Sequence, residues 1–450
     1  MLFVETGLRP VSTLKYFVRC TEKNREKNKI LKTLGKYSIG LGDRFGHQGA
    51  SQLKAIIEAS EKGIEITPVW NKSNREHITI GTQPHDVRIE ADTVTENAGF
   101  RKPYFVDADH INFDTVDRFI ECSDFFTIDV ASYIGKKADE NDILEFMSGI
   151  EKYTGELKIS GTKLSYKISK SQIKHIAEMY LFAAIKAWDI YRKIEKIKGT
   201  GNFITEVSMD EVGQPQSPVE LFFILKMLAS ENIPIQTIAP KFPGRFNKGV
   251  DYIGDPLLFA KEFESDILII DYAVREFGLP ENLKMSIHSG SDKFAIYPRI
   301  GAIIKKYDRG IHLKTAGTTW LEEVIGLAES GGEALDFVKE IYFKSLEQID
   351  ELCAPYADVI DIKVSLLPLI KEVSRWNSEE FSRALKHLPG NPDYNPNMRQ
   401  LLHVAYKLAS QKIDDYYRLL ETNEQAVSKG VYENIYYRHI CRLFDIKQSL

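Results

Sequence analysis

The chain of 450 residues lacks three features, and each absence excludes a class of protein. Its four cysteines are far apart and form no CxxC pair, which excludes a disulfide framework and indicates reduced thiols. No apolar run approaches the roughly 20 residues that span a bilayer, since even Val219–Ala229 contains Glu220 and Lys226. Basic residues are not in excess: 59 Lys and Arg face 64 Asp and Glu, so nucleic acid or an anionic membrane is not expected as a partner.

Several signals and motifs are missing as well. The first residues, MLFVETG, include no basic segment followed by an apolar one, so we expect no export signal and a cytoplasmic protein. The sequence contains no HExxH, no Walker loop and no GxGxxG, which argues against a zinc protease, an NTPase and a dinucleotide-binding enzyme.

A repeating pattern is present from about residue 36 onward. Short β-branched runs followed by turn residues alternate with stretches whose apolar residues recur every three or four positions. Such runs are typical of strands buried on both faces of a parallel sheet. Eight of these units predict a (β/α)8 barrel, with a doubly wound sheet as the alternative. The expected strands are Tyr37–Gly42, Ile64–Trp70, Tyr104–Ala108, Phe125–Val130, Phe203–Ser208, Ile235–Ala239, Lys284–His288 and Gly310–Leu313.

The pattern also suggests how the chain is divided. Residues 1–35 form a lead-in, 36–360 the barrel, and 361–450 a helical extension packed on the barrel. Two excursions interrupt the barrel. Residues 71–102, after the second strand, look β-rich, whereas residues 132–169, after the fourth, look like a loop or hairpin that forms a lid.

Reactive residues gather at the expected ends of the strands, where the active site of such a barrel is built. Seven of the eight strand ends carry them. They are Asp43, Arg44 and His47; Asp107, Asp109 and His110; Asp129; Glu206, Asp210 and Glu211; Lys241 and Arg245; His288, Asp292 and Lys293; and His312 and Lys314.

Four of the ten histidines lie at these ends, which favours a divalent cation bound by imidazole and carboxylate groups. The adjacent pair Asp109 and His110 is the best candidate: the histidine binds the metal while the carboxylate moves a proton. The competing interpretation is a helix-capping aspartate beside a structural histidine. Lysines and arginines at the same mouth indicate an anionic substrate, with simple rim solvation as the alternative.

Several segments in order resemble the tagaturonate/fructuronate epimerase family. They are GLGDRFG (40–46), VDADHINF (106–113), ITEVSMDEVGQPQSP (204–218), PKFPGRFNKGVDYIGD (240–255), IHSGSDKFAIYP (287–298) and IHLKTAGTTWLE (311–322). The Asp109–His110 pair is also distantly similar to the Asp-His pair of class II sugar aldolases, in which the histidine binds zinc and the aspartate transfers a proton.

The resemblance implies a metal-dependent interconversion of D-fructuronate and D-tagaturonate, with fructose and tagatose as further candidate substrates. The C4 hydrogen of these ketoses is not acidic, so inversion by retro-aldol cleavage and re-addition is expected. On this hypothesis Asp109 and Glu206 move protons and His110, His288 and His312 bind the metal. Glu206 is a reserve ligand, in which case Asp129 becomes the second acid–base group.

The remaining candidates are expected to hold the substrate. Lys241, Arg245, Lys293 and Lys314 are assigned to its carboxylate, and Asp43, Arg44, His47 and Asp129 to its other oxygens. The metal is Mn, Fe, Co, Ni or Zn, since such sites accept them all. A sugar-acid aldolase and a non-catalytic sugar-acid-binding barrel are the alternative functions, and the sequence leaves homo-oligomer formation open.

Overall fold

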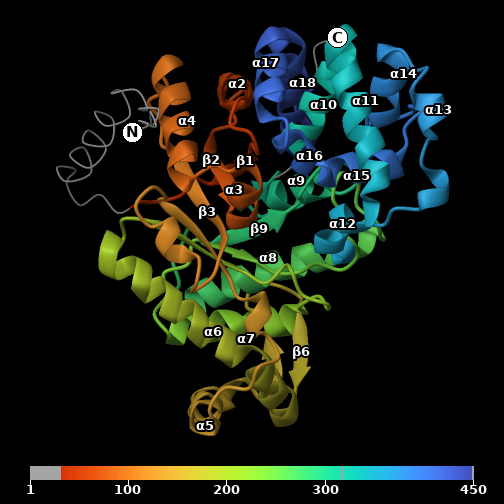
Figure 1. Cartoon of the computed structure of the whole chain (residues 1–450). Coiled ribbons are helices and arrows are strands. Elements are labelled where there is room, and N and C mark those ends of the chain that lie inside the picture. The colour runs from red at the N-terminus through yellow and green to blue at the C-terminus, as the bar shows by residue number, and fades with distance from the viewer. Residues whose placement is uncertain (1–31, 316–317, 448–450) are drawn as a thin grey trace, which may run out of the picture.

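The computed structural model describes residues 32–315 and 318–447 and shows a closed barrel of eight parallel strands (Figure 1). Around the barrel the order is β1-β10-β9-β8-β7-β4-β3-β2, so the first strand pairs with the last. Each strand overlaps one of the eight expected runs, and the (β/α)8 prediction is confirmed. The strands are β1 (Tyr37–Gly42), β2 (Ile66–Ser73), β3 (Phe105–Ile111), β4 (Phe125–Asp129), β7 (Ile204–Ser208), β8 (Thr237–Ala239), β9 (Lys284–His288) and β10 (Ile311–Lys314).

The interior of the barrel changes from apolar to polar along its axis. A small cluster of Leu34, Val69, Phe105, Phe125 and Ile204 fills the end at which the strands begin. Because side chains two positions apart on a strand share a face, the next inward positions lie closer to the mouth. Those positions are polar: Asn71, Asp107, Thr127 and Glu206. The sequence therefore closes the bottom of the barrel with hydrophobic side chains and reserves the upper part for chemistry.

Helices surround the strands, as alternating βα units require. The main ones are α2 (Gly49–Glu61), α4 (Pro84–Asn97), α6 (Lys170–Lys198), α7 (Pro218–Ser230), α8 (Pro256–Phe277) and α9 (Tyr297–Lys306). Local signals start them: Ser217 and Glu220 form a capping box before α7, and prolines open α4, α7 and α8. None of the helices in the described ranges is both long and apolar enough to cross a membrane.

The segment after β2 is helical, so the expectation of a β-rich excursion over 71–102 was wrong. Strand β2 continues to Ser73, and α3 (Asn74–Ile80) and α4 follow. Ser73 and Glu76 form a capping box that starts α3, and Gly81 ends it in the left-handed conformation. These caps outweigh the β-branched residues of HITI, whose weak helix propensity suggested a strand.

The segment after β4 contains the expected hairpin, made by β5 (Gly155–Lys158) and β6 (Ser165–Ile168), together with the helix α5 (Glu140–Gly149). The short helices η1 (Val116–Arg118), η2 (Ala131–Tyr133) and η3 (Glu151–Tyr153) flank these elements. Tyr153 packs its ring against Phe222 of α7 and Phe277 of α8, and its hydroxyl donates to Glu276. These contacts dock the excursion on the outer helices, and a lid role stays a prediction.

The helices after β10 form a second hydrophobic cluster beside the barrel. It includes buried side chains from α10 onward, before the boundary expected at residue 361. The elements are α10 (Thr318–Ser330), α11 (Gly332–Glu347), α12 (Ile349–Cys353), η4 (Ala354–Val359), η5 (Val364–Leu366), α13 (Ile370–Val373), α14 (Ser378–Leu385), α15 (Pro396–Val404), α16 (Tyr406–Ser410), α17 (Ile413–Thr422), α18 (Glu424–Glu433), the π-helix η6 (Asn434–Ile440) and α19 (Cys441–Phe444).

The last elements of the chain return to the barrel. Helix α18 and η6 pack against α2, and α19 packs against α9. Their buried residues Ile435, Tyr436, Ile440 and Leu443 belong to the main core of the barrel. Together, α18, η6 and α19 therefore occupy the gap between α2 and α9, the first and last helices of the barrel. In a simple (β/α)8 chain, the helix directly after the last strand fills this gap.

Candidate active site

A bulge in β3 aims His110 into the barrel mouth. The pairing of β3 with β4 shifts register between Ala108 and Ile111. Within this bulge His110 has φ +50°, the left-handed region that non-glycine residues seldom adopt. Bulges re-aim side chains, and strained backbone of this kind is concentrated at functional sites.

Three metal-ligating side chains converge there: His110, Asp210 and His288. Their donor atoms all lie within 4.8 Å of one another. Asp210 Oδ1 lies 3.1 Å from His288 Nδ1 and 3.4 Å from His110 Nε2. The His288 Nδ1 atom is buried and, despite its closeness to Asp210, makes no hydrogen bond with good geometry among the described residues. Asp210 is held to His110 only by a long hydrogen bond of 3.4 Å, so nitrogen and oxygen atoms lie close together with little mutual hydrogen bonding, as a cation-binding site requires.

The other nitrogen of each imidazole meets a deeper carboxylate. His110 Nδ1 lies 2.9 Å from Asp109 Oδ1, and His288 Nε2 lies 2.8 Å from Glu206 Oε1. A carboxylate that binds the far nitrogen of a metal-ligating histidine fixes the orientation of the ring. Asp109 and Glu206, the two predicted proton carriers, are thus placed behind the histidines.

Lys314 lies at the centre of these carboxylates and is almost completely buried. Its ammonium is 2.8 Å from Asp109 Oδ1, 3.2 Å from Glu206 Oε1 and 2.7 Å from Asp107 Oδ2, and it also donates to Thr127 Oγ1. The sequence predicted that Lys314 binds the substrate carboxylate. In the structure its donors are used by these side chains, so it is positioned to hold the carboxylates.

These contacts close a circuit of six side chains, which we call the Lys314 ring. Its members in order are Lys314, Asp109, His110, Asp210, His288 and Glu206. Positive and negative groups alternate around it, so each carboxylate touches two cationic or imidazole groups. Asp107 supplies a further carboxylate at Lys314 only.

The charges of the ring stabilise one another against burial. Burial alone disfavours ionisation, but the Lys314 ammonium outweighs it and holds the pKa of Asp109 and of Glu206 well below the usual range. Burial likewise lowers the pKa of His110, yet the Asp109 and Asp210 carboxylates raise it well above the usual value. Burial raises the pKa of Asp107 to about 6 because Lys314 compensates it only in part.

His312 lies apart from this cluster, although it was grouped with His110 and His288 as a ligand. It precedes Lys314 by two residues and is therefore one layer deeper in the barrel. Its Nδ1 lies 2.9 Å from Ser38 Oγ and its ring packs on Phe125. Burial lowers its pKa to about 3, so it is neutral. Asp210, which received no role from the sequence, stands at the position expected for a third ligand.

The other three cations assigned to the substrate carboxylate donate hydrogen bonds within the protein, and their role in substrate binding stays a prediction. Lys293 is buried and donates to the carbonyl oxygens of Asn247 and Val250. Lys241 donates to the carbonyl oxygen of Val212. Arg245 donates to the carbonyl oxygen of Ile360 at 3.2 Å and joins the barrel to the extension.

The three candidate residues after β1 also contact other parts of the protein. Asp43 accepts four backbone N–H bonds from residues 45–48 and so fixes the start of α2. Arg44 pairs with Glu76 and donates to the His403 carbonyl oxygen of α15. His47 is exposed, with its ring against Tyr417.

Two residues at the mouth retain unused polar atoms. Asp129 accepts a hydrogen bond from the Ala131 N–H through Oδ1, and burial raises the pKa of its carboxyl. The ammonium of Lys248 lies near Gly290, two residues beyond His288, and donates no hydrogen bond and forms no ion pair within the described part of the chain. Sequence reasoning missed Lys248 because it lies in a loop, seven residues after the strand-end lysine that was chosen.

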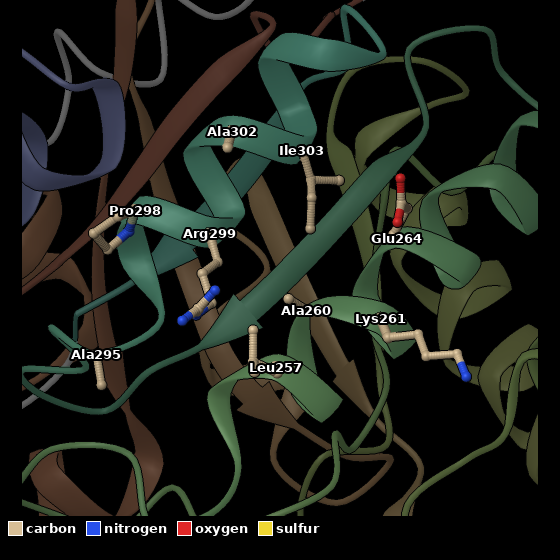
Figure 2. Close-up of a pocket in the computed structure, with 9 residues that line it drawn as sticks. All are labelled: Leu257, Ala260, Lys261, Glu264, Ala295, Pro298, Arg299, Ala302 and Ile303. Atoms are coloured by element: carbon tan, nitrogen blue, oxygen red, sulfur yellow. The ribbon is translucent and has the colours of Figure 1, made fainter.

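A separate groove of about 690 Å³ lies on the outside of the barrel between α8 and α9 (Figure 2). Arg299, Lys261 and Glu264 are its charged residues. No member of the Lys314 ring lines it, so the chemistry of the molecule is concentrated elsewhere.

Comparison with known proteins identifies the family to which the chain belongs. Residues 21–443 match the family model described as UxaE, tagaturonate epimerase. A tagaturonate/fructuronate epimerase of Thermotoga maritima is 29% identical over 420 residues, which are 90% of this chain and 80% of that protein. The crystal structure of fructuronate-tagaturonate epimerase UxaE from Cohnella laeviribosi superimposes with a TM-score of 0.75 at 24% identity, covering 92% of this chain and 83% of that one, and supports the fold.

The family match runs over nearly the whole length of the chain, including every strand of the barrel and each residue of the Lys314 ring. The chain therefore belongs to the tagaturonate epimerase family.

Proposed function

We propose that this protein is a divalent-metal-dependent epimerase that interconverts D-fructuronate and D-tagaturonate by inversion at C4. The observation that carries the proposal is the convergence of His110, Asp210 and His288 at the mouth of a barrel of this family.

The donor set suits a divalent cation. Two imidazole nitrogens and one carboxylate oxygen are ligands that Mn, Fe, Co, Ni and Zn accept. Both imidazoles have carboxylates behind them, as metal-binding histidines usually do. We assign His110, Asp210 and His288 as the ligands. A cation held there would act as a Lewis acid that polarises the substrate carbonyl and stabilises negative charge on its oxygens.

Inversion at C4 requires breaking a carbon–carbon bond. The ketose carbonyl is at C2, so the hydrogen at C4 is not acidic and cannot be removed by enolisation. When a base takes the proton of the C4 hydroxyl, the C3–C4 bond breaks and its electron pair moves into an enediolate over C2 and C3. The aldehyde that contains C4 rotates, the enediolate attacks its other face, and the proton returns to the C4 oxygen.

Asp129 is our first candidate for the proton acceptor because the direction of its pKa shift suits a base. Its pKa is raised by burial, whereas the pKa values of Asp109 and Glu206 are depressed, and a base works best when its pKa approaches the working pH. Glu206 is completely buried, and its Oε1 atom contacts His288 and Lys314, which favours a role in orienting His288. We therefore assign proton transfer to Asp129, with Asp109 as the second group.

Lys248 is our candidate for binding the substrate carboxylate. Its ammonium lies at the loop that follows His288 and is not neutralised by any described carboxylate. The loop itself is fixed, because the Lys248 N–H donates to the Val359 carbonyl oxygen at 2.8 Å.

Proton NMR in D2O tests the function. Fructuronate is incubated with the protein and a divalent cation, with an EDTA-stripped sample as the control. We expect metal-dependent formation of tagaturonate that retains hydrogen at C4. Deuterium at C4 would refute the carbon–carbon cleavage, and no conversion with any of the five metals would refute the function.

A further inference from the structure

Lys314 contacts none of the proposed cation ligands, yet it contacts both carboxylates behind the two histidines. Its ammonium is 2.8 Å from Asp109 Oδ1 and 3.2 Å from Glu206 Oε1. The same two oxygen atoms meet His110 Nδ1 at 2.9 Å and His288 Nε2 at 2.8 Å. Lys314 is therefore linked to each imidazole through a single carboxylate oxygen, which contacts both the ammonium and a ring nitrogen.

We propose that Lys314 is a positioning residue that holds the His110 and His288 rings so that, when a cation binds beside Asp210, they bind it as opposite tautomers with their lone pairs directed at it. This inference rests on the proposed metal-dependent function.

The tautomers follow from the acceptors. An ionised carboxylate can only accept hydrogen bonds, so the imidazole nitrogen that faces it must carry the hydrogen. His110 then carries its hydrogen on Nδ1, and His288 carries its hydrogen on Nε2. The opposite nitrogens, His110 Nε2 and His288 Nδ1, are the ones next to Asp210, and a cation bound there would displace any hydrogen from them and take up their lone pairs. The arrangement needs both carboxylates to stay in place.

Lys314 keeps them in place by neutralising charge. Asp107, Asp109 and Glu206 all approach within 3.2 Å of the one ammonium in the barrel interior. Without it, three buried carboxylates would repel one another at short range, where little water screens them. They would turn away from the imidazoles and release both rings. A methionine fills the volume of the lysine stem but supplies no charge.

Three variants separate this role from general support of the fold. Lys314→Met removes the charge, and Lys314→Met/Asp107→Asn removes it together with one carboxylate that touches no histidine. The matched control is Lys284→Met, which replaces another buried barrel lysine, one that donates to the carbonyl oxygens of Leu34 and Gly35 near the closed end. Circular dichroism checks folding.

The first readout is nitrogen-15 NMR of histidine-labelled protein, with and without Co²⁺. In the wild type and in Lys284→Met we expect slowly exchanging hydrogens on His110 Nδ1 and His288 Nε2. Both signals should be lost in Lys314→Met and in the double variant. The double variant carries less uncompensated buried charge and replaces the single variant in the test if Lys314→Met does not fold.

The second readout is Co²⁺ affinity, followed by visible absorption. Loss of the carboxylates behind metal-binding histidines typically costs 10–100-fold in affinity, and we expect a loss of about that size in both Lys314 variants. A folded Lys314 variant with the wild-type signals and affinity would overturn the proposal. Failure of the wild type to bind Co²⁺ would instead count against the proposed function, while the two hydrogens would still report on Lys314.

Discussion

At the scale of single residues, the site depends on groups that differ in how far they can move. His110 is fixed by a bulge, a positive φ and a carboxylate, and Lys314 by four acceptors. Asp129 and Lys248 have unused polar atoms at the mouth. The rigid residues suit cation binding, which requires fixed geometry, and the freer ones suit contact with a substrate that changes shape during reaction.

Asp129→Asn tests the assignment of the base. The amide keeps the hydrogen bond from the Ala131 N–H but cannot take a proton, so we expect kcat to fall by about 10²–10⁴-fold. Co²⁺ affinity should stay within about twofold of the wild type, because Asp129 is not a proposed ligand. Asp114→Asn, an exposed aspartate just beyond β3, is the matched control. An unchanged kcat in Asp129→Asn would return the role to Asp109.

Lys248→Met tests recognition of the substrate carboxylate. Loss of an ion pair with the substrate should raise KM for fructuronate by about tenfold or more, since hydrogen bonds to charged groups contribute about 1.5–3 kcal/mol. Turnover of a neutral ketose, where measurable, should not change. Lys261→Met, in the outer groove of Figure 2, is the control. Equal effects on acidic and neutral sugars would show that Lys248 acts on the loop instead.

At the scale of elements, the alternation of side chains along each strand explains which site residues the sequence could locate and which it could not. The strands, their ends and the pair Asp109–His110 were predictable because short apolar runs alternate with helices. Strand-end position alone grouped His312 with the two histidines, because it does not reveal that His312 lies two residues below Lys314. Asp210 was recognised at its strand end, but only the fold shows that it, rather than Glu206, faces both histidines.

The closed end of the barrel has its own electrostatic clamp, centred on Asp124 just before β4. Arg88 of α4 pairs with Asp124 Oδ1 at 2.8 Å, Lys32 pairs with Oδ2 at 2.7 Å, and the Val106 N–H also donates to this carboxylate. Burial would raise the pKa of Asp124, but Arg88 and Lys32 outweigh it and lower the pKa to about 2. The clamp therefore couples α4 to two strands.

Asp124 should make stability depend on pH in the acid range. A depressed pKa gives stabilisation that is complete above the unfolded value, near 4, and is lost as the pH falls towards 2. At about 1.4 kcal/mol per pKa unit, the wild type should lose about 2 kcal/mol of unfolding free energy relative to Asp124→Asn over that range. Urea unfolding from pH 7 to pH 2 measures it. Asp117→Asn, in an exposed pair with Lys193, should change stability by less than about 1 kcal/mol at any pH.

At the scale of the whole molecule, the barrel and the extension are joined by buried charge as well as by hydrophobic packing. Asp292, at the end of the β9 loop, binds Arg399 of α15 at 2.8 Å and Asn434 of η6 at 3.1 Å. Arg438 of η6 in turn pairs with Glu322 of α10 at 2.6 Å. No periodicity in the sequence marks such contacts, since their partners are up to 142 residues apart.

Gly301→Ala tests how tightly the end of the chain is docked. A Cβ at Gly301 of α9 would lie 1.8 Å from the Leu443 carbonyl oxygen of α19, so backbone must shift. Overpacking of this kind costs about 1–3 kcal/mol, and we expect a lower unfolding temperature and earlier proteolysis of the C-terminus. Gly149→Ala in α5, where a Cβ meets nothing within 4 Å, is the control and should be neutral or stabilising. A wild-type melting temperature in Gly301→Ala would show that α19 is loosely held.

The return of the terminal helix to the gap between α2 and α9 has a consequence for synthesis of the chain in the cell. Domains form as the chain emerges from the ribosome, at about 5–20 residues per second. All eight strands emerge before η6 and α19, so a seam between β1 and β10 that closes at that stage lacks the cover of these helices. We therefore expect a chain truncated before η6 to expose the apolar surface that Ile435, Ile440 and Leu443 cover. Chaperones and proteases recognise exposed apolar surface of this kind. Survival of the protein in the cell therefore depends on synthesis of η6 and α19.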